Sequence, residues 1–297
     1  MNETVFRATL ATYYINHYAM LTCILIIVMI KSLKTKIYRS DSMSIIKNEI
    51  PILEFDTDQT AVFCPTHEKL GLTLPKKCVF AFLGSYIDEY ANKTASKQIS
   101  TFLSATKHYP IYITNYKGEE IVLCQAPVGS APAVQILDWL IGYGVCEIIS
   151  AGSCGVLEKF SEGTFLVPYK ALRDEGTSYH YSPPSRFMII NDKARNAIEK
   201  TILEHGMKYQ EVITWSTDGF FRETKEKVAY RKSEGCSVVE MECSALAACA
   251  DFRGATWGMI LYTADSLADV DKYDERNWGG NAYEYALTLC LDAVIKL

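Results

Sequence analysis

Short apolar runs alternate with helix-patterned segments from about residue 44 to the end of this 297-residue chain. Seven of these runs have the length and the β-branched or aromatic content of buried strands, at 78–83, 120–124, 147–151, 164–167, 211–215, 237–239 and 257–263. Apolar residues at helical spacing fill the intervals at 131–143, 192–205, 246–252 and 282–295. This alternation predicts an α/β fold around a largely central, buried sheet.

The chain divides into two regions of different character. Residues 43–297 are predicted to form one domain, because no linker rich in Pro, Gly or Ser and no internal repeat interrupts them. Residues 1–42 form an apolar and basic N-terminal extension. Its uncharged run, 19–30, is shorter than the ~20 residues of a membrane-spanning helix, and basic residues follow it.

Three interpretations of this extension stay open. The stretch 13–30 could be a marginal membrane anchor, or the extension could dock on the fold. It could also be translated upstream sequence, with Met43 as the natural start, and this interpretation is preferred because the segment shares no pattern with the remainder of the chain. A cleaved signal peptide fits poorly, because the basic residues follow the apolar run instead of preceding it.

Charge and cysteine content argue against two classes of partner. The net charge of −5 gives no support for a nucleic-acid partner, whose phosphates need a basic face. The ten cysteines contain no CxxC pair and no Cys/His cluster with zinc-ligand spacing, so no metal is expected. Most of them lie inside apolar segments, where free cysteine behaves as a small hydrophobe. We therefore expect a cytoplasmic protein, membrane-anchored only if the N-terminal extension is real.

The most informative motif is Glu240-Met241-Glu242, where an apolar run changes into a small-residue helix. Open α/β sheets bind their ligands at such strand-to-helix junctions. A carboxylate there can accept two hydrogen bonds from a vicinal diol such as that of ribose, and methionine offers an adaptable apolar surface to a sugar face. A structural corner with a helix-capping glutamate explains the same residues, so other segments must decide.

Further unusual residues follow the predicted strands. They are Gly84, the Gly152-Ser153-Cys154-Gly155 turn, the polar and aromatic loop 173–181, the segment 218–221, and Ala264-Asp265. Several loops that meet at one edge of a sheet would form a single pocket.

These motifs, in this order, resemble the nucleoside phosphorylase family, which includes uridine phosphorylases, hexameric-type purine nucleoside phosphorylases and methylthioadenosine nucleosidases. The resemblance covers roughly residues 75–297. It implies a three-layer α/β/α domain with a mixed, barrel-like central sheet. It also implies a homo-oligomer, dimer-based and up to hexameric in size, whose sites lie near subunit interfaces. No organic cofactor is expected; inorganic phosphate is the implied co-substrate.

The resemblance assigns the ribose site to the central motif. Cleavage of a ribosyl C–N bond passes through a cationic, oxocarbenium-like sugar. Glu242 is similar to the carboxylate that accepts the 2′- and 3′-hydroxyls and stabilises this charge at low local dielectric. Met241 is similar to the residue that packs on the ribose. Glu240 could contact the ribose or be tied to backbone donors, and both interpretations stay open.

Four residues are candidates for contacts with the base. The resemblance implies that Phe220 stacks on it and that Asp265 protonates, or hydrogen-bonds to, N7 of a leaving purine. A core phenylalanine and a turn aspartate are the structural alternatives. Arg173 and His180, in the loop 173–181, could hydrogen-bond the base or the 5′-hydroxyl. The glutamine and arginine that read uracil in relatives are absent from 224–227, so purine or pyrimidine preference stays open.

The candidate phosphate-binding residues are Gly84, Lys107, Gly152 and Ser153. The Ser153 hydroxyl and neighbouring backbone N–H groups could face an anion, and Lys107 could add a positive charge. However, Ser150 stands where phosphorylases carry an arginine, and the expected Gly-Asp-Pro-x-Arg loop is replaced by residues 84–88. Both arginines that would clamp a phosphate dianion are therefore missing.

The leading hypothesis is a nucleoside phosphorylase of uridine or purine type, which converts a nucleoside and phosphate into ribose-1-phosphate and free base in nucleoside catabolism or salvage. The alternative is a nucleosidase that uses water. The missing arginines favour this alternative. Against it, the sequence offers no obvious glutamate after the first strand to activate water, and Glu89 is the nearest one. A third hypothesis, a nucleoside-binding protein without turnover, conflicts with the intact Glu242 and Asp265, because a pure binder needs no general acid.

Overall fold

The computed structural model describes residues 44–297, of which Ile45–Leu297 form one compact unit. The N-terminal extension 1–42 and the alternative start at Met43 lie outside the described residues. Within the described part, every helix is too short or too polar to cross a membrane.

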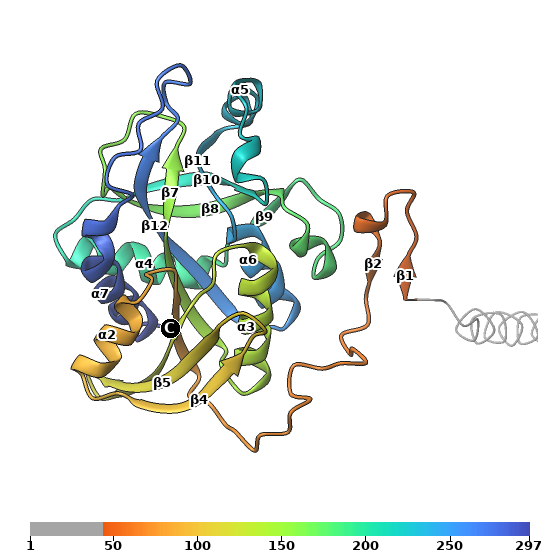
Figure 1. The fold of residues 1–297 in the computed structure, drawn as a ribbon, viewed down its shortest axis with the longest axis vertical. Coiled ribbons are helices and arrows are strands. Elements are labelled where there is room, and N and C mark those ends of the chain that lie inside the picture. Colours follow the sequence, from red (N-terminus) through yellow and green to blue (C-terminus); the bar gives the residue numbers. More distant parts are fainter. Residues whose placement is uncertain (1–43) are drawn as a thin grey trace, which may run out of the picture. The chain divides into compact units, whose positions relative to one another are not determined.

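A ten-stranded mixed sheet forms the centre of this unit (Figure 1). Its strands are β3 (Lys77–Ala81), β4 (Lys97–Leu103), β5 (His108–Tyr116), β6 (Glu119–Gln125), β7 (Glu147–Val156), β8 (Phe165–Asp174), β9 (Phe187–Ile189), β10 (Gln210–Thr217), β11 (Cys236–Glu240) and β12 (Thr256–Ser266). The order is β11-β10-β8-β12-β7-β3-β6-β5-β4, and β9 pairs with β8. A separate short hairpin joins β1 (Ile45–Ile46) and β2 (Phe55–Asp56).

Part of the sheet closes into a ring. Strand β11 pairs in parallel with β10 and also in antiparallel fashion with β7, through Val238 opposite Val156. The strands β11, β10, β8, β12 and β7 therefore form a closed band, from which β3, β6, β5 and β4 continue as an open sheet. The expected mixed, barrel-like sheet is confirmed.

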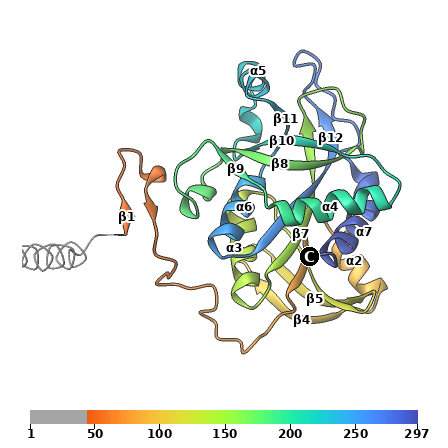
Figure 2. The same ribbon diagram turned by 180° about the vertical axis from the view of Figure 1, so that it is seen from behind.

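Helices cover the sheet in two groups (Figures 1 and 2). The elements are α2 (Tyr86–Lys93), α3 (Ser130–Gly142), α4 (Asp192–Glu204), α5 (Lys225–Ser233), α6 (Cys243–Phe252) and α7 (Tyr283–Val294). Helices α3 and α6 pack against one another over one hydrophobic core, while α2, α4 and α7 share a second core. Because each core lies between helices and the sheet, the three-layer α/β/α prediction is confirmed.

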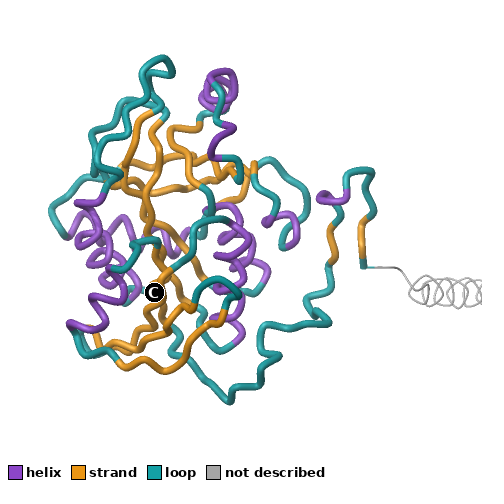
Figure 3. Tube along the Cα trace, viewed as in Figure 1, coloured by secondary structure: helices purple, strands orange, loops and turns teal. Residues whose placement is uncertain are grey.

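The predicted strands and helices are all present; most ends shift by up to three residues, whereas β7 and β8 continue well past their predicted ends (Figure 3). The β4–β5 hairpin was not predicted because β4 is an edge strand without a fully buried residue. Helix α5 was not predicted because it is strongly charged and buries only Val228 and Arg231.

The predicted turn at residues 152–155 is wrong, because these residues continue strand β7. Neither glycine there has a positive φ. Their neighbours approach closely instead: a Cβ on Gly152 would lie 3.0 Å from Met259 Cε, and one on Gly155 would lie 3.1 Å from Val239 Cγ1. A side chain at either position would require these neighbouring side chains to shift by a few tenths of an ångström.

Candidate active site

A cavity of about 700 Å³ opens at the carboxyl ends of β3, β6, β7 and β11. Nine of the eleven residues predicted from the sequence line it: Gly84, Lys107, Gly152, Ser153, Phe220, Glu240, Met241, Glu242 and Asp265. The two others, Arg173 and His180, lie outside its wall. Segments far apart in the sequence therefore meet in one hollow, as expected for an α/β sheet.

Glu242 stands at the N-cap of α6 and is only 6% exposed. The backbone N–H of Gly129 donates a hydrogen bond to its Oε1 atom, and the Ser130 hydroxyl donates to the Met241 carbonyl at 2.5 Å. Burial, with a contribution from the neighbouring Glu240, raises the pKa of Glu242 to about 8. A carboxylate held in this way keeps further acceptor capacity for the hydroxyls of a ligand.

Glu240 supports this corner with both carboxylate oxygens. Its Oε1 accepts hydrogen bonds from Ser216 Oγ at 2.6 Å and Thr214 Oγ1 at 3.1 Å. Its Oε2 accepts from the backbone N–H groups of Glu242 at 2.7 Å and Cys243 at 2.6 Å. Burial nevertheless raises its pKa. Of the two interpretations of Glu240, the contacts favour a carboxylate tied to backbone donors, which positions Glu242.

Phe220 and Met241 provide apolar surface in the cavity wall. Phe220 belongs to a short 3-10 helix, η3 (Phe220–Arg222), and is 42% exposed. The adjacent Phe221 is 93% exposed and does not line the cavity. The ring that faces the cavity is therefore that of Phe220, and it does not belong to the hydrophobic core.

Asp265 lies within strand β12 and is 6% exposed. Burial raises its pKa, although its own backbone N–H, the nearby Tyr273 and the charge of Arg276 act in the opposite direction. A carboxyl group whose pKa is raised retains a proton more readily at neutral pH. This property suits a group that donates a proton to a departing base.

Arg173 and His180 lie outside the cavity for a local reason. Arg173 is buried, and its guanidinium donates to Ser178 Oγ at 2.9 Å, to the Pro183 carbonyl at 2.7 Å and to the Ser182 carbonyl at 3.1 Å. These bonds fix the loop that contains it. His180 ends a short 3-10 helix, η2 (Thr177–His180), and is exposed.

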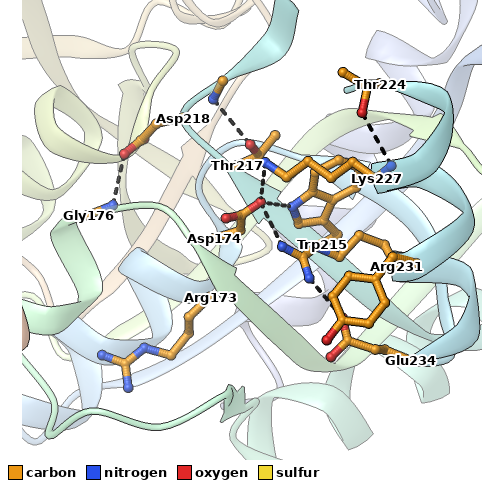
Figure 4. Close-up of polar contacts among 12 residues, drawn as sticks. Arg173, Asp174, Gly176, Trp215, Thr217, Asp218, Thr224, Lys227, Arg231 and Glu234 are labelled. Carbon is orange, nitrogen blue, oxygen red and sulfur yellow. Dashed lines mark hydrogen bonds and ion pairs between the residues drawn. The ribbon is translucent and has the colours of Figure 1, made fainter. Parts of the chain in front are cut away.

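Helix α5, which follows the segment with Phe220, is held to the sheet by Asp174 at the end of β8. Figure 4 shows Trp215, Lys227 and Arg231 converging on its carboxylate. The distances to Asp174 Oδ2 are 2.9 Å from Trp215 Nε1, 2.6 Å from Lys227 Nζ and 3.2 Å from Arg231 Nη2. Burial would raise the pKa of Asp174, but these donors lower it overall. Because Lys227 and Arg231 belong to α5, this cluster ties α5 to the sheet.

The candidate phosphate site carries little positive charge. Among the described residues that line the cavity, Lys107 is the single cation, and its ammonium group donates to Gln125 Oε1 at 2.7 Å. Ser150, which stands in place of an arginine, is fully buried and accepts a hydrogen bond from Trp257 Nε1 at 3.0 Å. Glu89 also lies outside the cavity wall.

Several lining residues were not predicted. Glu223, directly after η3, is one of them, and burial together with the charge of Asp265 raises its pKa to about 7. Its position next to the Phe220 segment was the available sequence signal. The aromatic residues Phe82, Tyr109, Tyr262, Trp278 and Tyr283 also line the cavity. Within residues 44–297, no group of three His, Cys, Asp or Glu side chains is placed to hold a metal ion.

Comparisons with known proteins agree with this architecture. A sequence model of the phosphorylase superfamily matches residues 76–296. The guanosine phosphorylase of Halorubrum lacusprofundi is 24% identical over 206 residues, which are 67% of this chain and 85% of that protein. The 5'-methylthioadenosine/S-adenosylhomocysteine nucleosidase of Buchnera aphidicola is 30% identical over 47% of this chain and 64% of its own length. The structure of a purine nucleoside phosphorylase from Toxoplasma gondii has a TM-score of 0.65 at 20% identity, over 74% of this chain and 90% of that one, and it supports the fold.

Proposed function

The chain belongs to the phosphorylase superfamily, and on that premise we propose that it cleaves the N-glycosidic bond of a ribonucleoside. The observation that carries the proposal is the Glu242 carboxylate, buried beside Met241 in the same cavity as Phe220 and Asp265. In the proposed complex Met241 packs on the sugar, Glu242 stabilises the developing positive charge, and Phe220 and Asp265 contact the leaving base. Relatives named as a phosphorylase of guanosine and as a nucleosidase support the same bond as the target.

In the proposed reaction the bond between C1′ and the base nitrogen breaks, and its electron pair leaves with the base. Asp265 donates a proton to N7 of a purine, so the base departs neutral. Glu242, in its ionised form, accepts hydrogen bonds from the ribose hydroxyls and stabilises the cationic sugar from its buried position in the cavity wall. The oxygen of the nucleophile then bonds to C1′, and where that nucleophile is water its proton passes through solvent to the Asp265 carboxylate, which restores the acid.

The charge of the cavity wall favours water as the nucleophile. Four carboxyl groups, those of Glu223, Glu240, Glu242 and Asp265, share the wall with the single ammonium group of Lys107. Without an arginine, a phosphate dianion in this surrounding would be offset by Lys107 alone, and each carboxyl group in its ionised form would repel it. We therefore place hydrolysis first and phosphorolysis second. The second candidate keeps support from Lys107 and Ser153, which line the same cavity.

The proposal is tested by release of free base from adenosine, inosine, guanosine, uridine and methylthioadenosine, each with and without phosphate. Free ribose, formed equally in both conditions, supports hydrolysis. Ribose-1-phosphate formed only with phosphate identifies the phosphorolytic alternative. Nucleoside binding without release of any base would contradict the proposal and favour a non-catalytic binder. The homo-oligomeric assembly stays a prediction, which sedimentation analysis would test.

A further inference from the structure

Three consecutive residues at the end of β8 each bind a different part of the chain. Asp174 is the acceptor that ties α5 to the sheet. The backbone N–H of Gly176 donates to Asp218 Oδ2 at 2.8 Å, in the segment that leads to Phe220 (Figure 4). Glu175, between them, reaches helix α6. The reaction described above uses none of these three residues.

Glu175 is only 4% exposed, and its carboxylate accepts two hydrogen bonds. Its Oε2 accepts from the backbone N–H of Ser178 at 2.9 Å, and its Oε1 accepts from the Ser244 hydroxyl at 2.9 Å. The nearby positive charge is that of Arg173, whose guanidinium donates to Ser178 Oγ. Because a buried carboxylate is costly without fixed partners, the contact with Ser244 is a defined link between this loop and α6.

Ser244 lies in the first turn of α6, two residues after Glu242, and is fully buried. Its backbone N–H donates to Ser216 Oγ at 3.0 Å, and the Ser216 hydroxyl donates to Glu240 Oε1 at 2.6 Å. Glu240 in turn accepts from the backbone N–H of Glu242. The first turn of α6 is therefore held on two sides, by Glu240 at the end of β11 and by Glu175 from the loop after β8.

The direction of the Glu242 carboxylate depends on the position of this turn. Glu242 is the N-cap of α6 and accepts from the Gly129 N–H at the start of α3, so this bond requires the two helix starts to keep their distance. A misplacement of about 1 Å can slow a reaction about 10²-fold. A contact that fixes α6 can therefore affect the chemistry without touching the substrate.

We propose that Glu175 is a positioning residue for the reaction: through the Ser244 hydroxyl it fixes the first turn of α6, and thereby holds the Glu242 carboxylate against the Gly129 N–H. The inference rests on the proposed function, because that function assigns Glu242 to the cationic sugar. Glu175 itself lies outside the cavity wall. Arg173, which the sequence singled out, serves here by fixing the loop that carries Glu175.

The first test is Ser244→Ala, which removes only the hydroxyl that joins α6 to Glu175. With the nucleoside that wild-type protein cleaves best, kcat should fall about 10-fold or more while KM stays close to that of wild type, because Glu242 acts on the transition state. Thr201→Val is the matched control, since it removes another fully buried hydroxyl, in α4 and outside the cavity wall. This control should keep the wild-type kcat.

The second test follows the ionisation of Glu242 by NMR of labelled glutamate carboxyl carbons, with Glu242→Gln to identify the signal, and needs no turnover. Burial, with Glu240 and Asp218, raises the pKa of Glu242 to about 8, whereas the Gly129 N–H lowers it. Displacement of α6 in Ser244→Ala weakens that N–H contact, so the titration midpoint should move upward by about 1 pH unit. The rise of kcat with pH should move in the same direction.

Two variants of Glu175 examine the same link from the other side. Glu175→Ala should reproduce the effects of Ser244→Ala on kcat and on the titration midpoint. Glu175→Gln should retain more activity than Glu175→Ala, because its amide oxygen can accept from the Ser178 N–H while its amide nitrogen donates to the Ser244 hydroxyl. If one alanine variant does not fold, the other provides the same comparison.

An unchanged kcat in Ser244→Ala, an equal loss in Thr201→Val, or an unmoved titration midpoint of Glu242 would overturn the inference. If wild-type protein cleaves nucleosides under these outcomes, the proposed function survives without it. If wild-type protein cleaves none, but Ser244→Ala raises the midpoint of Glu242, the proposed function fails and the positioning of Glu242 by Glu175 stands.

Discussion

The backbone N–H of Gly129 donates a hydrogen bond to the carboxylate of Glu242, a residue 113 positions away. Gly129 is the N-cap of α3 and Glu242 is the N-cap of α6, so the bond joins the starts of two helices at the cavity wall. Gly129 has φ +100° and ψ 138°, a conformation that side-chain-bearing residues rarely adopt.

Gly129→Ala should therefore impair both stability and catalysis. The backbone strain would cost about 1–3 kcal/mol of stability, and relief of that strain would move the donor away from Glu242. The melting temperature and kcat/KM should both fall. Gly206→Ala is the matched control, because Gly206 also has a positive φ, +71°, but lies after α4 and away from the cavity. The Gly206→Ala variant should lose stability while it retains kcat/KM. If both variants lost activity, the loss in Gly129→Ala could not be assigned to the hydrogen bond between Gly129 and Glu242.

Glu242→Gln should abolish most turnover and preserve the fold. Loss of the negative charge next to the oxocarbenium-like sugar should lower kcat by about 10²–10³-fold, the effect typical of removing one transition-state contact. The amide can still accept the Gly129 hydrogen bond, so the far-ultraviolet circular dichroism should be unchanged. Activity close to that of wild type would disprove the assignment of Glu242 to the ribose.

The same residue should make stability depend on pH. The pKa of Glu242 is about 8 in the folded protein and near 4.5 in the unfolded chain, so the folded state binds more protons between these values. Its contribution to the free energy of unfolding should therefore decrease as the pH rises from about 4.5 towards about 8. Compared with Glu242→Gln, wild-type protein should lose relative stability across this window. Parallel melting curves at every pH would show that the carboxyl group is not perturbed by burial.

Asp265→Asn should affect purine nucleosides selectively. Without the carboxylic acid the purine must leave without a proton at N7, which should lower kcat by about 10²–10⁴-fold. Uridine has no N7, so any uridine cleavage should change far less. Kinetics with adenosine and uridine provide the measurement, and equal losses on both would exclude the role of Asp265 as a purine acid.

Asp174→Ala should loosen the wall that carries Phe220. The change removes the acceptor shared by Trp215, Lys227 and Arg231, and leaves the half-buried Lys227 and the buried Arg231 without this partner. We expect a loss of about 1–3 kcal/mol in stability and a higher KM for nucleosides. Asp251→Asn, at an exposed position of α6, is the control and should alter neither quantity. An unchanged KM in Asp174→Ala would show that the ion pairs of Asp174 do not influence substrate binding.

Sequence patterns predicted the fold well where burial is continuous. Apolar runs such as those in β7 and β12 can only be buried strands in an alternating α/β pattern. The edge strand β4 escaped prediction, since it buries no residue completely. The pattern at Gly152 and Gly155 is typical of a turn, and only the structure shows that both lie within a strand, where Met259 and Val239 leave little room for a side chain.

The site residues that could be predicted are those whose side-chain chemistry suits the reaction and which follow a predicted strand. Glu242 and Asp265 follow predicted strands, so their convergence could be expected from topology alone. Arg173 also lies at the end of a strand, yet local hydrogen bonds to Ser178 and its neighbours turn its side chain away, which no spacing rule reveals. Glu223 lies in a charged stretch without periodicity, directly before the N-cap of α5, so no pattern marks its place in the cavity wall.

The closed band of strands has a consequence for ligand exchange. Strand β11, which leads into Glu242, is hydrogen-bonded on both sides, to β10 and to β7, so this wall cannot swing outward without breaking two ladders. The segments around Phe220 and Trp278 belong to no strand of the band. Nucleoside entry and base departure should therefore proceed by displacement of these two segments. The rates of association and dissociation would then be set at that gate, while the wall formed by β11 stays rigid.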